Sequence, residues 1–173
     1  MWEALAGILG KALDAVPVAR WMRENSRDRI DHDRKRFREL DELLPERALD
    51  RYLEEAFQQQ VLRSTVEPVD EYLEWARFSS NDFVIARLQQ RRAAFDHALV
   101  ELRGFLSRNL FPRKGVSDRW YFRPAQNPDL SSSFSPEDLK RYDRAVEGLN
   151  EHISNCETSY KSFRQVVKKR LMT

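Results

Sequence analysis

The chain has 173 residues, of which 41% are hydrophobic and 34% are charged, and its net charge is +2. This length suits one domain with a continuous apolar core, and five scattered glycines exclude the phosphate-cradling loops of Walker A and dinucleotide-binding motifs. Abundant charge with little glycine is typical of packed helices rather than of strand-rich folds.

Cys156 is the single cysteine in the chain. One cysteine excludes an intramolecular disulfide and a multi-cysteine zinc site, and it fits a reducing compartment, so we expect a cytoplasmic protein. The first residues lack the cationic start of a secretory signal, because Glu3 precedes Lys11, the first basic residue. No segment reaches the run of about 18 uncharged apolar residues that a membrane span needs. We therefore expect a protein that is neither exported by that route nor integral to a membrane.

Residues 1–17 predict an amphipathic helix that ends near Pro17. Its apolar face is too large to leave in water, so we expect it to contact a protein. The polar face carries Glu3, Lys11 and Asp14 instead of the several lysines and arginines of interfacial membrane helices, which disfavours a membrane surface as partner. The predicted protein interface consists of Trp2, Leu5, Ile8, Leu9, Leu13 and Val16.

Three more helices are expected before residue 80. A thin apolar stripe predicts one over residues 18–44, and Pro45 suits the first turn of the next because its missing N–H needs no intrahelical partner there. Thr65–Pro68 is expected to separate the third helix from the fourth. The predicted inner faces of these two helices consist of Leu49, Leu53, Ala56, Phe57 and Val61, and of Tyr72, Leu73 and Ala76.

The two longest helices are expected in the second half of the chain. Ser79–Asp82 offers capping oxygens to the fifth helix. Ser135–Asp138 supplies the sixth with a capping hydroxyl, a proline at the first helical position and two acids. Apolar residues then recur at steps of three and four from Leu139 to Val167, a seam that packs against another helix within the chain or across a dimer.

These elements predict an all-α fold, an up-and-down helical bundle with long fifth and sixth helices, in a single domain over residues 1–173. The second and third helices would cover the remaining apolar faces. One long basic-aromatic loop, residues 111–135, interrupts the helices.

Signatures of catalysis and metal binding are absent from the sequence. No serine stands in a G-x-S-x-G elbow, and no Glu-x-x-His pair occurs. His152 and Cys156 could share a helix edge as two metal ligands, but a closed zinc site needs about four and a catalytic one about three. Asp31–His32–Asp33 resembles an acid-base cluster, yet successive helical residues do not face one another, and we expect a solvated, salt-bridged face. We therefore expect no catalytic residue, no metal and no cofactor, and a buried, unreactive Cys156.

Charge is divided unevenly along the chain. Residues 41–75 carry ten acids and three bases, whereas residues 76–123 carry ten bases and four acids. The basic segment 87–123 could pair with nucleic-acid phosphates, or the preceding acidic helices could neutralise it, because sequential helices usually pack as neighbours. A net charge of only +2 favours neutralisation.

The loop 111–135 is the local feature that packing explains least, because structureless connections beyond about 12–15 residues are uncommon and usually functional. Its mixture of aromatic and cationic residues suits a stacking, anion-binding surface. It equally suits a loop that folds back and buries Trp120 and Phe122 in the end of the bundle. The candidate anion- or partner-binding residues are Arg113, Lys114, Arg119, Trp120, Tyr121 and Arg123.

Long apolar seams without a catalytic constellation favour a non-catalytic interaction or assembly protein that acts through protein–protein contacts, with a partner or with itself. The alternative is a nucleic-acid-binding bundle that uses the basic segment 87–123. An enzyme of unrecognised class is the third hypothesis.

Overall fold

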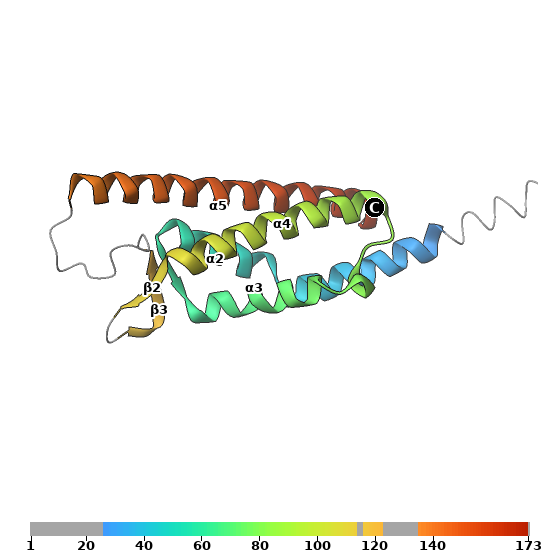
Figure 1. Cartoon of the computed structure of the whole chain (residues 1–173). Helices are drawn as coiled ribbons and strands as arrows, with labels where there is room; N and C mark the ends of the chain where they lie inside the picture. Colours follow the sequence, from blue (N-terminus) through green and yellow to red (C-terminus); the bar gives the residue numbers. More distant parts are fainter. Residues whose placement is uncertain (1–25, 114–115, 123–134, 173) are drawn as a thin grey trace, which may run out of the picture.

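The computed structural model describes residues 26–113, 116–122 and 135–172 (Figure 1). This part of the chain is mostly helical, as predicted, and it also contains a small sheet that was not predicted. A helix over residues 26–43 comes first. The elements after it are α2 (Glu46–Phe57), β1 (Gln60–Leu62), α3 (Arg63–Ala76), the 3-10 turn η1 (Ser79–Asn81), α4 (Ala86–Asn109), β2 (Leu110–Arg113), β3 (Val116–Phe122) and α5 (Pro136–Leu171).

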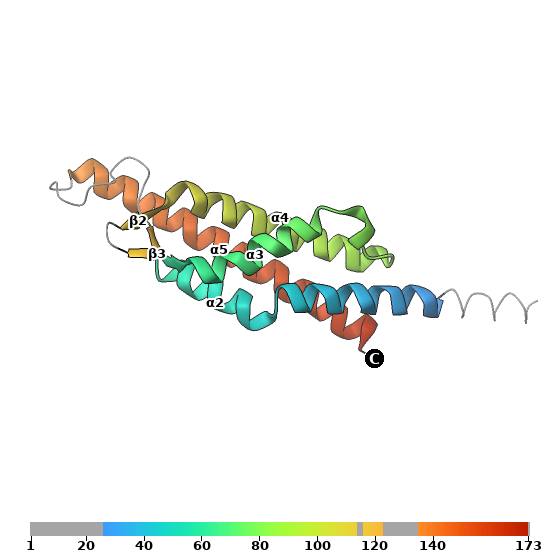
Figure 2. The ribbon, with the colours of Figure 1, turned by 90° about the horizontal axis from the view of Figure 1, so that it is seen from below.

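The two longest helices, α4 and α5, run antiparallel and pack along each other (Figures 1 and 2). α2 packs on both α5 and α3, and α3 packs on α4. No helix in the described ranges combines the length and the apolar character that crossing a membrane requires.

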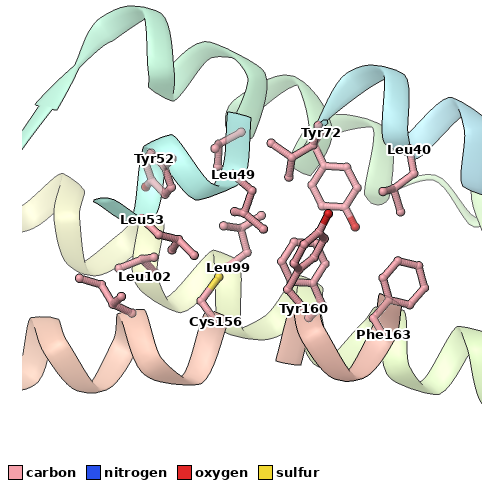
Figure 3. Close-up of a cluster of buried hydrophobic side chains, with 14 of the residues drawn as sticks. Leu40, Leu49, Tyr52, Leu53, Tyr72, Leu99, Leu102, Cys156, Tyr160 and Phe163 are labelled. Carbon is pink, nitrogen blue, oxygen red and sulfur yellow. The ribbon is translucent and has the colours of Figure 1, made fainter. Parts of the chain in front are cut away.

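The core lies where the first helix, over residues 26–43, and α2, α3, α4 and α5 face one another, and aromatic side chains fill much of it (Figure 3). The ring of Phe95 on α4 lies 5.1 Å from that of Tyr160 and 6.5 Å from that of Phe163, both on α5. Tyr72 of α3 completes the cluster at 5.7 Å from Phe95. Such aromatic contacts fix how α3, α4 and α5 pack beyond what burial alone would specify.

The start of α5 confirms the predicted cap. The hydroxyl of Ser135 accepts the backbone N–H of Asp138, and the Asp138 carboxylate accepts the backbone N–H of Ser135, which together form a capping box. The Ser135 hydroxyl also donates to the Asp138 carboxylate at 2.7 Å, and this bond together with the one from the Ser135 backbone N–H holds the pKa of Asp138 below its usual range. The apolar seam is buried from Leu149 to Val167, whereas its first member, Leu139, is exposed.

The predicted loop 111–135 is in part a β-hairpin. β3 is the central strand of an antiparallel sheet with the order β1-β3-β2. Trp120 stands opposite Val61 of β1 on one side and Pro112 of β2 on the other. The prediction of a structureless connection is therefore wrong for residues 111–113 and 116–122, and residues 123–134 lie outside the described part of the chain.

The predicted third helix, α2, ends at Phe57, although its predicted inner face extended to Val61. Leu49, Leu53 and Ala56 are buried as predicted, but Phe57, the last residue of α2, is 65% exposed, and Val61 belongs to β1. The chain turns at Gln59, whose φ of 60° lies in the left-handed region that ordinary residues rarely adopt. Helical spacing cannot continue through such a turn.

The predicted break at Thr65–Pro68 is also wrong, because α3 begins at Arg63 and includes Pro68. The backbone N–H of Leu62 and the hydroxyl of Thr65 both donate to the carboxylate of Glu55 on α2. This side-chain acceptor stabilises the first turn of α3.

The start of α4 differs from the prediction in the group that caps it. Ser79–Asp82 does not cap this helix, since its N-cap residue is Ile85 and no side chain of the cap itself accepts a hydrogen bond. The carboxylate of Asp33, far away in the sequence, accepts the backbone N–H groups of Val84 at 2.7 Å and of Ile85 at 2.8 Å. Asp33 is 0% exposed, so the prediction of a solvated face at residues 31–33 is wrong for this carboxylate.

Candidate functional site

The predicted basic-aromatic residues are divided between a described hairpin and segments outside it. Arg119, Trp120 and Tyr121 lie on β3 and the backbone of Arg113 belongs to β2, whereas Lys114 and Arg123 lie outside the described residues. The Arg119 guanidinium donates to the side-chain oxygen of Gln60 on β1 at 3.1 Å. This bond joins β3 to β1 beside the backbone pairing of Arg119 with Leu62.

The aromatic side chains of β3 differ in burial. Phe122 is 4% exposed, and its ring lies 6.1 Å from Phe105 of α4 and 6.3 Å from Tyr142 of α5. Trp120 is partly buried against the core, and Tyr121 is partly exposed. Phe122 thus attaches the hairpin to the bundle, while Trp120 and Tyr121 keep part of their surface available.

A cavity of about 220 Å³ lies beside the hairpin, between α2 and the sheet. Arg51, Glu55, Gln58, Gln60, Leu62 and Arg119 line it. Burial acts to raise the pKa of Glu55, but the hydrogen bonds from Leu62, Thr65 and Arg51 outweigh burial and lower it. Glu55 is therefore a charged structural acceptor at the corner between α2 and α3.

An open groove of about 540 Å³ lies between α3 and α4 and is called here the α3–α4 groove. Its lining residues are Asp70, Leu73, Glu74, Ala76 and Arg77 of α3 or its end, and Asp96, Val100, Arg103, Gly104 and Ser107 of α4. Arg103 donates two hydrogen bonds, of 2.8 and 2.9 Å, to the two carboxylate oxygens of Asp70. This bidentate pair holds a guanidinium at the groove in one orientation.

One end of the groove adjoins a buried polar network. Arg92 is 3% exposed and donates to a carboxylate oxygen of Asp96 and to the backbone carbonyls of Asn81 and Ala76, each at 2.8 Å. The hydroxyl of Tyr72 donates to the other oxygen of Asp96. Burial raises the pKa of Asp96 although the charge of Arg92 opposes the shift. Because Arg92 and Tyr72 bind both carboxylate oxygens, we interpret Asp96 as the anchor that ties the end of α3 and η1 to α4.

The two potential metal ligands on α5, His152 and Cys156, lie in different environments. His152 packs its ring 4.8 Å from that of Phe105. Cys156 is buried in the core, and burial raises the pKa of its thiol to about 12. Within the described residues, no three histidine, cysteine or acidic side chains gather where they could hold a metal ion.

The basic segment 87–123 is neutralised in part by the fold. Arg92 pairs with Asp96 inside the protein, and Arg103 pairs with Asp70 on the acidic α3. Arg87, Arg91 and Arg108 are exposed on α4. The arginines of the segment therefore do not form one continuous cationic surface along α4.

The predicted interface on the N-terminal helix, Trp2 to Val16, lies outside the described residues. No protein-family model, curated protein or solved structure matches the chain. The α3–α4 groove was not predicted from the sequence. The sequence offered one hint, the apolar Val100 on the side of α4 that faces away from the core. A single apolar residue on the exposed face of a helix is common, so this hint did not predict a groove.

Proposed function

We propose that this protein is a non-catalytic helical interaction or assembly protein that acts through protein–protein contacts at the α3–α4 groove. The observation that carries the proposal is the composition of the groove. Val100 is 52% exposed there, beside the partly buried Leu73 and Ala76. Arg103, held by Asp70, stands next to these apolar groups. Protein interfaces combine an apolar centre with a polar rim, and they are enriched in arginine.

The outer face of α4 is suited to close approach by another helix. Ala93, Val100, Gly104 and Ser107 are small or short and lie on one face, at helical steps that add up to whole turns. Gly104 presents no side chain, and a Cβ added there would meet no atom closer than 3.5 Å. The atom at that distance belongs to the flexible Arg108 side chain, so the small residues of this face leave the backbone of α4 accessible to a partner helix that lies along the groove, a common mode of recognition.

The same geometry weakens the alternative of nucleic-acid binding along residues 87–123. A phosphate-binding track needs cations that are free to pair with phosphates. Arg92 and Arg103 are instead paired with acids of the chain. A second copy of the chain is the simplest occupant of the groove, because most soluble oligomers are built from identical chains. We also propose a cytoplasmic location, because a single cysteine fits a reducing compartment.

The test is the mass of the protein in solution over a range of concentrations, with and without duplex DNA and at two salt concentrations. The proposal expects a species heavier than one chain that forms without DNA and persists at the higher salt. A chain that stays monomeric and shifts only with DNA at low salt would instead support the nucleic-acid alternative.

A further inference from the structure

The cavity of about 220 Å³ between α2 and the sheet, called here the sheet cavity, brings together two guanidinium groups that are far apart in the sequence. Arg51 reaches it from α2 and Arg119 from β3. Clefts that hold drug-sized ligands measure about 300–1,000 Å³. The sheet cavity is smaller, so it suits one small chemical group and not a nucleotide or an extended chain.

The charge of Arg119 is not balanced by an acid within the described residues. Its guanidinium donates there to the side-chain oxygen of Gln60, a neutral acceptor, at 3.1 Å. A guanidinium carries five N–H donors, so most of them remain available after this bond. Arg119 is also partly buried, which removes part of its charge from water. A partly desolvated cation that binds only a neutral group favours an anion beside it.

Glu55, the carboxylate that lines the sheet cavity, already accepts bonds on both of its oxygens. One oxygen accepts the backbone N–H of Leu62 and the hydroxyl of Thr65. The other accepts the Nε–H of Arg51 at 3.0 Å, and this bond leaves the two terminal nitrogens of Arg51 free to donate elsewhere. The lining residues therefore carry two positive charges and one negative charge, a surplus of one positive charge.

We propose that the sheet cavity binds a single carboxylate group, held by the guanidinium groups of Arg51 and Arg119. One carboxylate balances the surplus charge, and its two oxygens match the fork of a guanidinium. A phosphate monoester carries about two negative charges and would leave one of them unbalanced next to Glu55. The carboxylate belongs to a small free acid or to an acidic side chain of a partner, and both present the same group. The sheet cavity and the α3–α4 groove share no lining residue, so this inference and the proposed function can fail independently.

The experiment is an NMR titration of the full chain with acetate, with inorganic phosphate and with a blocked peptide that contains one glutamate, each compared with chloride at equal ionic strength. The Nε–H signals of Arg51 and Arg119 report binding. Acetate should shift both signals to saturation and bind more tightly than phosphate. Arg119→Gln and Arg51→Gln should each weaken acetate binding about ten-fold or more, because each removes charge-assisted hydrogen bonds. Tighter binding of the peptide than of acetate assigns the carboxylate to a partner protein, and the reverse order assigns it to a free acid.

The matched control is Arg47→Gln, which removes the same charge from an exposed position on α2, one helical turn before Arg51 and outside the lining of the sheet cavity. This variant should bind acetate within about two-fold of the unchanged chain. Arg119→Lys keeps the charge but loses the fork, so it should also weaken binding. Circular dichroism of all variants checks that the fold is retained. The proposal is overturned if acetate shifts neither signal beyond the effect of chloride, if phosphate binds more tightly than acetate, or if the control loses as much as Arg119→Gln and Arg51→Gln.

Discussion

Replacing Asp33 by alanine should destabilise the protein strongly, although this residue lies in a segment crowded with surface charges. Its carboxylate accepts two backbone N–H groups at the start of α4, from Val84 and Ile85. It also places a negative charge at the positive end of the helix. Both contributions disappear in Asp33→Ala.

The expected loss follows from the number of bonds. A lost helix cap costs about 0.5–2 kcal/mol, and a hydrogen bond to a charged group contributes about 1.5–3 kcal/mol net of its exchange with water. Ile85 is partly buried and Val84 is exposed, so water can satisfy one N–H more easily than the other. We therefore expect Asp33→Ala to lower the free energy of unfolding by about 2–4 kcal/mol. Asp33→Asn keeps one acceptor oxygen and should lose about half as much.

Urea denaturation followed by circular dichroism measures these differences, and Asp31→Ala is the matched control. Asp31 is an exposed carboxylate two residues away whose contact with Arg34 is 3.4 Å long. An exposed pair of this kind contributes little, so the control should change stability by less than about 0.5 kcal/mol. Equal losses for Asp33→Ala and Asp31→Ala would refute the capping role.

Other changes test the core and the groove in the same assay. Arg92→Met should cost about 3–5 kcal/mol, because Arg92 is buried and its loss leaves the carboxylate of Asp96 and the carbonyls of Asn81 and Ala76 without their donor. Phe122→Ala should cost about 3–5 kcal/mol, and Trp120→Ala should cost less because part of its ring is exposed; the reverse order would contradict the packing of β3. Burial raises the pKa of Cys156 to about 12, so the folded thiol stays protonated where the unfolded thiol ionises. Stability should then fall as the pH rises from about 8.5 to 10, less so in Cys156→Ala, and an equal slope in both proteins would contradict this. Gly104→Ala should raise stability by about 0.5–1 kcal/mol, because the new methyl group fits without a clash and alanine favours the helix; a loss would show that the site is crowded.

The sequence predicts α5 well because the signals that define it are local. Ser135, Pro136 and Asp138 lie within four positions of one another, and the buried seam repeats at helical spacing. The start of α4 could not be predicted in this way. Its acceptor, Asp33, is 51 and 52 residues from the two N–H groups that it binds, and the nearer Ser79–Asp82 offered the expected capping chemistry.

The sheet was missed for a related reason. β1 has three residues, and its partner strand β3 follows some 60 positions later, so no local period reveals the pairing. Because Val61 continues the helical spacing of apolar residues, the prediction extended the third helix over the residues that form β1. Lys114–Gly115 was the available hint, because Arg113 pairs with Val116 and two residues with glycine commonly connect hairpin strands.

The α3–α4 groove could not be predicted from the sequence, because it depends on how α3 packs against α4. Val100 and Gly104 look like ordinary surface positions until the acidic face of α3 lies beside them.

The most direct test of the proposed function compares the solution masses of Val100→Arg and Ala94→Arg with that of the unchanged chain. Both variants add the same side chain to an exposed position on α4, but only Val100 lines the α3–α4 groove. An arginine at position 100 fills the groove with a long charged side chain where a partner would lie, and this obstructs association whether or not the guanidinium pairs with an acid of the groove. We predict that Val100→Arg reduces the assembly to single chains and that Ala94→Arg does not. Equal masses for both variants and the unchanged chain would contradict the assignment of the groove as the contact surface.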